Sequence, residues 1–128
     1  LTGCKTVEQL ISEAAQRISF MSQEEVLRRI RSSDTGITLL DVRERDSFQR
    51  SHIPAAILIP RGQLELRVNE LLPDPTARIV VYCQFGKIST LAAATLRDMG
   101  FTRAIAMEQG METWLEKGYP TSDGIVDR

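Results

Sequence analysis

The chain has 128 residues, of which 42% are hydrophobic and 26% are charged, and its formal net charge is −1. These values are typical of a globular protein with one domain and one hydrophobic core. So small a net charge creates no field that would attract nucleic acid or an anionic membrane, and no apolar run approaches the ~20 residues that span a bilayer. We therefore expect neither a nucleic-acid partner nor a membrane span.

Residues that form disulfides or bind metals are scarce. The chain has two cysteines, Cys4 and Cys83, and one histidine, His52. This usage favours reduced thiols in a cytoplasmic compartment, and we expect neither a metal nor an organic cofactor. An alternative localisation comes from the first residues, LTGC, which resemble the end of a bacterial lipoprotein signal with Cys4 as the lipidated residue. Because the first residue is not Met, we also expect a fragment or a mature form.

The first predicted element is a helix over residues 6–18. Thr6 and Gln9 have the spacing of a capping box, and apolar residues recur behind them at helical intervals. A terminal amphipathic helix must bury its apolar side, either as a packing extension of the domain or as the contact of a homodimer. A short edge strand is predicted over residues 18–21, and a second helix begins at Ser22.

The next part of the chain predicts two strands and a helix. The aliphatic run over residues 37–42 predicts a buried strand, which brings Asp41 and Arg43 to its carboxyl end. A second short strand is predicted over residues 56–59. After a turn, a helical pattern follows and ends before Pro73, because proline cannot continue a helix.

Residues 78–100 are the strongest candidate for a chemical site. Residues 79–82 are β-branched or aromatic and predict a buried strand, directly followed by Cys83. A polar loop with one glycine, residues 84–87, separates this strand from a helical pattern over residues 88–99. The sequence therefore predicts a strand, a tight loop and a helix, with a thiol at the end of the strand.

This arrangement predicts a nucleophile. Ligands of open parallel sheets bind beyond the carboxyl ends of the strands, and a helix N-terminus presents unpaired amides. A loop curled around Cys83 would point several N–H groups at its sulfur, and Lys87 would add a positive charge. We expect a thiolate surrounded by amide donors. The alternative is that Cys83 is only a small buried hydrophobic residue.

The last predicted elements are a strand over residues 103–107 and a helix that ends at Gly118. Trp114 is expected in the core, and the polar residues 121–128 are expected to fray. Strands that alternate with helices predict an α/β fold, with a mainly parallel sheet and helices on both faces.

The loop sequence CQFGKIS resembles the active-site loop of the rhodanese-type sulfurtransferases, C-x-x-G-x-R-S. The matching positions are Cys83, Gly86 and Ser89. Ile88 stands where many members of the family carry arginine, so a cation that would hold an anionic donor is missing. Lys87 or Arg61 can supply that charge instead.

Other segments resemble the same family in the same order. The segment from DVRE to HIPAA is similar to the family's DVR…F…HIPGA pattern, with Ala55 in place of glycine. EQGMETWLEKGYP is similar to the closing motif GG…W…GYP, with Gln109 in place of the first glycine. The resemblance implies a single rhodanese-like domain with a five-stranded sheet over residues 19–120. Residues 1–18 would then be an N-terminal helical extension, and residues 121–128 a tail.

The resemblance implies a sulfurtransferase in which Cys83 takes a sulfane sulfur as a persulfide and passes it to a thiophilic acceptor. The donor would be a small sulfur-containing anion such as thiosulfate, or a protein persulfide, and the acceptor a thiol or cyanide. His52 is expected to fix a loop, with a general base as the alternative. The other implied site residues are the loop residues Gln84, Phe85, Gly86, Lys87, Ile88 and Ser89, with support from Asp41, Arg43 and Arg61.

Three other functions stay open on the same residues. The first is a protein-to-protein sulfur relay with poor thiosulfate activity, which the missing loop arginine favours. The second is a non-catalytic binding or regulatory module, since a fold does not fix a function. The third is a phosphatase, which the sequence disfavours because Ser89 occupies the position where the related phosphatase loop carries its phosphate-binding arginine.

Overall fold

The computed structural model describes residues 3–33 and 36–124. Its elements, in chain order, are α1 (Val7–Arg17), β1 (Phe20–Met21), α2 (Gln23–Arg31), β2 (Thr38–Asp41), α3 (Arg45–Arg50), β3 (Ile57–Leu58), the 3-10 turn η1 (Arg61–Gln63), α4 (Leu64–Leu71), β4 (Ile79–Tyr82), α5 (Lys87–Asp98), β5 (Ile105–Met107) and α6 (Met111–Glu116). Among the described residues, no helix is both long enough and apolar enough to cross a membrane.

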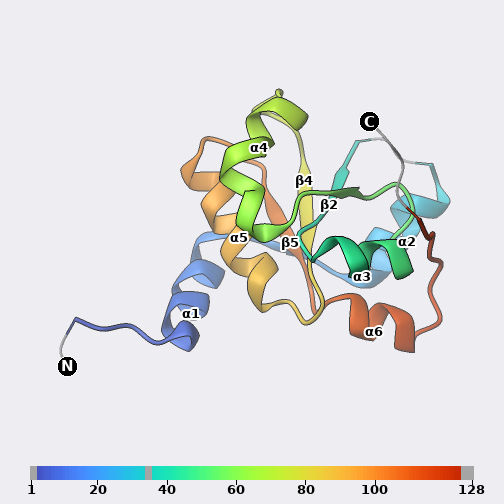
Figure 1. Ribbon diagram of the computed structural model, residues 1–128, viewed down its shortest axis with the longest axis horizontal. Helices are drawn as coiled ribbons and strands as arrows, with labels where there is room; N and C mark the ends of the chain where they lie inside the picture. Colours follow the sequence, from blue (N-terminus) through green and yellow to red (C-terminus); the bar gives the residue numbers. More distant parts are fainter. Residues whose placement is uncertain (1–2, 34–35, 125–128) are drawn as a thin grey trace.

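The five strands form one sheet in the order β1-β5-β4-β2-β3, and every neighbouring pair is parallel. This confirms the predicted parallel α/β fold. Because the strands run in one direction, their carboxyl ends meet at one edge of the sheet and their amino ends at the opposite edge (Figure 1). We call these the carboxyl edge and the amino edge. β4 lies at the centre of the sheet, so it carries Cys83 to the middle of the carboxyl edge.

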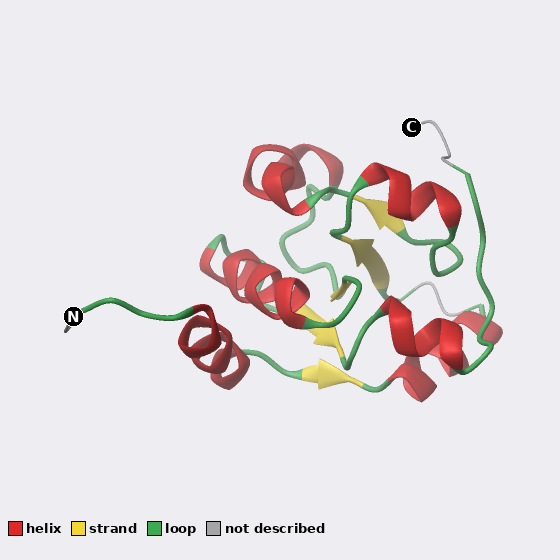
Figure 2. Cartoon of the chain, turned by 60° about the horizontal axis from the view of Figure 1, so that its bottom comes forward, coloured by secondary structure: helices red, strands yellow, loops and turns green. Residues whose placement is uncertain are grey.

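The sheet lies between two layers of helices (Figure 2). Successive side chains of β4 point to opposite faces, as the period of a strand requires. Ile79, Val81 and Cys83 pack with α4 and α5, whereas Val80 and Tyr82 pack with α2, α3 and α6. Since both faces of β4 are covered, its sequence is continuously apolar rather than alternating.

Helix α1 confirms the first predicted element. Thr6 is its N-cap, and both hydrogen bonds of the capping box with Gln9 are present. The helix packs against α5, with Ala14 buried and Arg17 paired to Asp98 at 2.8 Å. The expectation of a packing extension is therefore met, and a homodimer through α1 stays a prediction.

Two parts of the chain differ from the prediction. Helix α3 has no counterpart in the predicted elements, because it is six residues long and has no side-chain cap. The prediction that residues 121–128 fray is wrong for its first part. Ser122 exchanges two backbone hydrogen bonds of 2.9 Å with His52, and the N–H of Gly124 donates to Gln49. Residues 125–128 lie outside the described residues.

Candidate active site

Cys83 directly follows β4, and its side chain is only 3% exposed. The register of β2 and β4 pairs Asp41 with Tyr82, so the two strands deliver their following residues to the same part of the carboxyl edge. Cys83 lies at the base of a pocket of about 550 Å³ that opens at this edge. The thiol is thus buried at a recess with both apolar and charged lining residues, where a small reactant can approach it.

The loop after Cys83 surrounds the sulfur with hydrogen-bond donors. The backbone N–H groups of Gly86 and Ser89 donate to the sulfur at 3.1 and 3.3 Å. The thiol in turn donates to the Ser89 hydroxyl oxygen at 3.3 Å. Two amides that converge on one atom favour negative charge on it. The predicted arrangement of amides around the sulfur is therefore present.

Two glycines allow this loop to close so tightly. Gly86 has φ +99°, and a Cβ at this position would lie 2.7 Å from the carbonyl oxygen of Gln109. At Gly110, a Cβ would overlap the carbonyl of Gln84 and lie 2.7 Å from that of Cys83. Neither position tolerates a side chain without a shift of backbone atoms.

The start of α6 holds the carbonyl groups of the loop. The N–H of Met111 donates to the carbonyl oxygen of Cys83 at 2.8 Å, and the N–H of Glu112 donates to that of Gln84 at 3.1 Å. These bonds use two amides that a helix start leaves unpaired. Because the carbonyl oxygens turn toward α6, the amides that follow in the loop are directed at the sulfur.

Asp41 and Arg43 form a buried ion pair beside the loop. The Nη2 of Arg43 lies 2.8 Å from Oδ2 of Asp41, and the two side chains are 7% and 0% exposed. Arg43 also donates to the carbonyl of Ser51 at 2.7 Å and to the side-chain oxygen of Gln84 at 3.3 Å. Burial opposes the charge of Arg43, but hydrogen bonding and attraction from Asp41 outweigh it and raise the pKa of Arg43. The pair fixes the loops around the pocket, as expected.

Tyr82 extends this network beneath the pocket. Its hydroxyl oxygen accepts a hydrogen bond from the backbone N–H of Ile53 at 3.1 Å. Burial, assisted by the negative charge of Asp41, raises the pKa of Tyr82 well above its usual value. Tyr82 therefore acts as a neutral structural group that joins β4 to the chain after α3.

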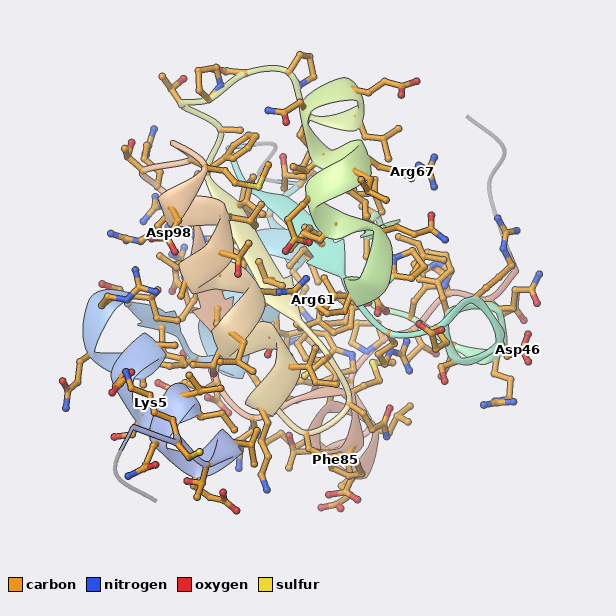
Figure 3. The ribbon with its side chains drawn as sticks, turned by 60° about the vertical axis from the view of Figure 1, so that its left-hand side comes forward. Lys5, Asp46, Arg61, Arg67, Phe85 and Asp98 are labelled. Carbon is orange, nitrogen blue, oxygen red and sulfur yellow. The ribbon has the colours of Figure 1, made fainter. Side chains whose placement is uncertain are left out.

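The two cations expected to replace the missing loop arginine have different positions. Arg61 lines the Cys83 pocket and lies between α4 and α5 (Figure 3), paired to Glu65 at 2.9 Å and within 3.4 Å of the Thr95 hydroxyl. Lys87 is exposed at the start of α5, outside the pocket lining. Of the two, Arg61 is the one that the structure brings to the pocket.

The mouth of the pocket is partly apolar. Ile88 is 49% exposed, and Leu115 from α6 is 46% exposed. Phe85 projects from the tip of the loop with 64% of its surface exposed (Figure 3). The pocket is lined by Val42, Arg43, Glu44, Ser47, Arg50, Ser51, Arg61, Cys83, Gln84, Ile88 and Leu115.

His52 lies away from the Cys83 pocket and has structural contacts. Its Nδ1 lies 2.8 Å from the carbonyl oxygen of Phe48, and its ring stacks on that of Phe48 with centroids 3.7 Å apart. It also carries the backbone bridge to Ser122. The expectation that His52 fixes a loop is confirmed, and the general-base alternative has no support from its position.

Sequence reasoning missed Arg50 and Leu115 as pocket residues. Arg50 ends the unpredicted helix α3, so no local pattern indicated where its side chain would lie. Leu115 lies in the last helix beside the fully buried Trp114, and no local pattern indicates that its side chain reaches the pocket.

Comparison with known proteins agrees with this geometry. The family model described as the rhodanese-like domain matches residues 22–117. YrkF of Bacillus subtilis, named as a candidate sulfur carrier protein, is 36% identical over 83% of this chain, which spans about half of YrkF's length (56%). Thiosulfate sulfurtransferase GlpE of Coxiella burnetii is 32% identical over 68% of this chain and 78% of its own.

A solved structure from Rhodopseudomonas palustris, described as a protein of unknown function and candidate tyrosine phosphatase, is also similar. It superposes with a TM-score of 0.84 at 26% identity, over 95% of this chain and 98% of that one. The similarity therefore includes α1 as well as the sheet and its helices.

Proposed function

This chain belongs to the family of rhodanese-like domains, and from that premise we propose that it is a sulfurtransferase acting through a persulfide on Cys83. The donor is a sulfane-sulfur compound, either thiosulfate or a persulfide, and the acceptor is a thiol or cyanide. The observation that carries the proposal is the pair of amides, from Gly86 and Ser89, directed at a buried sulfur in an open pocket. Relatives named as a sulfur carrier and a thiosulfate sulfurtransferase support it.

The proposed reaction has two displacement steps. The Cys83 thiolate attacks the outer sulfur of the donor, so that a new S–S bond forms and the donor's own bond to that sulfur breaks. With thiosulfate, sulfite leaves with the electron pair of the broken bond. The acceptor then attacks the outer sulfur of the persulfide, and Cys83 leaves as a thiolate. No net oxidation is needed, since the sulfur enters and leaves in the same oxidation state.

The loop supplies the stabilisation that this chemistry needs. The negative charge begins on the Cys83 sulfur and moves to the outer sulfur when the persulfide is formed. Amide donors that are already oriented stabilise such charge without reorganisation, in the way an oxyanion hole does. The remaining loop residues, Gln84, Phe85, Lys87 and Ile88, are proposed to form the binding surface around that sulfur. Asp41 and Arg43 act through the loops that they fix, and Arg61 supplies positive charge to the pocket.

Sulfur loading followed by mass spectrometry tests the proposal. After exposure to thiosulfate or polysulfide, we expect the peptide that contains Cys83 to gain about 32 Da, the mass of one sulfur atom. The Cys83→Ser variant should form no thiocyanate from thiosulfate and cyanide, whereas the matched Cys4→Ser variant should retain the full rate. Equal loading of Cys4 and Cys83, or equal rates for wild type and Cys83→Ser, would contradict the proposal and favour a binding module.

A second candidate is a protein-to-protein sulfur relay. The exposed apolar side chains of Ile88 and Leu115 at the pocket mouth favour it, because a small dianion gains nothing from them and a protein surface does. Two of the arginines that line the pocket, Arg43 and Arg61, already pair with Asp41 and Glu65. At Arg43 and Arg61, a thiosulfate molecule would therefore compete with these carboxylates, whereas Arg50 lines the pocket from the exposed end of α3.

An Ile88→Arg variant separates the relay from thiosulfate chemistry. If the wild type works as a relay, we expect the added guanidinium to raise the rate with thiosulfate by about tenfold, through a charge-assisted contact. Loading from a protein persulfide should not rise, and the uncharged control Ile88→Gln should leave the thiosulfate rate unchanged. A wild type that already reacts faster with thiosulfate than with the persulfide would contradict the relay.

Phosphatase activity is not proposed, despite the description of the Rhodopseudomonas palustris relative. The loop from Cys83 to Ser89 contains no arginine, and the two amides that it orients are bound to sulfur. Without a guanidinium in the loop, bidentate recognition of a phosphate group is missing. Absence of hydrolysis of an aryl phosphate is the expected result.

A further inference from the structure

A second recess lies at the amino edge of the sheet, away from Cys83. It has a volume of about 650 Å³ and is lined by side chains from the starts of β1, β4 and β5 and from α2 and α5. Four of the lining residues are arginines, and we call this recess the arginine cleft. Its complete lining consists of Ser19, Phe20, Met21, Ser22, Glu25, Arg29, Arg78, Arg97, Thr102, Arg103 and Ile105.

Two of these arginines lie at the amino ends of neighbouring strands. Arg78 directly precedes β4, and its carbonyl oxygen accepts a hydrogen bond of 2.9 Å from the N–H of Thr38. Arg103 lies in the turn before β5, the strand that pairs with β4, and both arginines line the cleft. Like charges that lie near each other repel. The fold therefore brings two positive charges to the same recess.

A third guanidinium joins this pair from α5. The Nε of Arg97 donates to the carbonyl oxygen of Ala104 at 2.9 Å, which fixes the side chain beside the residue that follows Arg103. This contact uses only one nitrogen of the guanidinium. Arg97 therefore reaches the cleft in a defined orientation, with its terminal nitrogens available in addition to the structural bond.

The nearby carboxylates do not balance these three arginines. Among the described residues that line the cleft, Glu25 is the only acid, and it accepts hydrogen bonds from Arg28 and Arg29. Asp98, which follows Arg97, pairs with Arg17. Asp74 lies outside the lining, and hydrogen bonds from Thr76, followed by the charge of Arg103, lower the pKa of its carboxyl group. The cleft thus concentrates positive charge on a chain whose net charge is −1.

We propose that the arginine cleft binds the polyphosphate group of a small molecule, a function independent of sulfur transfer. Guanidinium groups bind phosphate through paired N–H donors, and the lining adds hydroxyl groups from serine and threonine. Phe20 is 41% exposed in the lining and offers a flat face on which a nucleotide base can stack. The volume lies within the range of known ligand sites.

The position of the cleft separates it from the chemistry at Cys83. Arg78 directly precedes β4 and Cys83 directly follows it, so these two lining residues lie at opposite ends of one strand. That strand is at the centre of the sheet (Figure 1). A ligand in the arginine cleft cannot contact the sulfur. Its binding can therefore be measured while sulfur loading at Cys83 serves as a separate control for a correctly folded protein.

Calorimetric titration of the full chain with tripolyphosphate and with a nucleoside triphosphate, at about 0.15 M salt, tests the proposal. We expect saturable binding of at least one of them, weakened by about tenfold or more in the Arg78→Gln/Arg103→Gln double variant. The matched control, Arg45→Gln/Arg67→Gln, removes the same charge from exposed positions on α3 and α4 and should bind like the wild type. Sulfur loading and thermal midpoint should be unchanged in both.

The two ligands distinguish the source of the phosphate group. Tighter binding of the nucleotide than of tripolyphosphate, lost in Phe20→Ala, would identify a nucleotide, whereas equal affinities would identify the phosphate chain alone. Binding of neither ligand at millimolar concentration would overturn the proposal. So would equal weakening in the control variant, or binding of oligonucleotides alone.

Discussion

The carboxyl and amino edges of this sheet differ in the groups that can stabilise a negative charge. At the carboxyl edge, backbone amides and a buried ion pair surround Cys83, and Arg43 and Arg61 each have a carboxylate partner. At the amino edge, side-chain guanidinium groups gather with little acid among them. Main-chain donors are fixed by the fold and suit a reaction in which charge moves between two sulfur atoms. Side-chain donors suit recognition, and we expect their removal to cost the fold little stability.

The largest effect should come from the buried ion pair of the carboxyl edge. Asp41→Asn leaves the buried guanidinium of Arg43 without its negatively charged partner, so we expect the free energy of unfolding to fall by about 3 to 5 kcal/mol. Chemical denaturation measures this loss. Asp98→Asn breaks an exposed ion pair to Arg17, with side chains 64% and 51% exposed, and is the matched control. It should cost less than about 1 kcal/mol. Similar losses in both variants would show that burial does not distinguish these pairs.

A smaller effect is expected at the glycine that supports the Cys83 loop. In Gly110→Ala, the new methyl group meets the carbonyls of Cys83 and Gln84, which cannot move without displacing the loop amides. We expect a loss of about 2 kcal/mol in stability and slower sulfur loading of Cys83. Gly62→Ala adds the same methyl group where no atom lies within 4 Å, and both properties should be unchanged. A normal rate of loading in Gly110→Ala would show that the loop amides are not required.

The sequence predicted those parts of the molecule that depend on local pattern. The capping box of α1, the apolar run of β4 and the loop that turns its amides toward Cys83 follow from residues near one another in the chain. The contacts that complete the site join distant residues. The support of the loop by Gly110 and the approach of Arg61 to the pocket depend on how α6 and α4 pack, which no local pattern specifies.

A smaller change in stability is expected at two positions where the chain departs from the family pattern. Ala55 and Gln109 stand where the motifs carry glycine, and they have φ values of 70° and 58°. Residues with a Cβ are strained in this left-handed region by about 1 to 2 kcal/mol, although glycine also makes the unfolded chain more flexible. We expect Ala55→Gly and Gln109→Gly each to raise the free energy of unfolding by about 0.5 to 1 kcal/mol. A loss of stability in both variants would mean that other contacts compensate the strain.

The smallest change in the free energy of unfolding is expected at the amino edge of the sheet. Arg78→Gln removes one of two neighbouring positive charges and leaves the backbone bond to Thr38 intact. The free energy of unfolding should change by less than about 0.5 kcal/mol or rise slightly, because relief of repulsion offsets the lost packing of the side chain. Arg43→Gln, the matched change at the carboxyl edge, should cost several-fold more, since it leaves Asp41 buried without a cation. A large loss in Arg78→Gln would instead assign that arginine to the stability of the sheet and remove the main reason for a ligand at the arginine cleft.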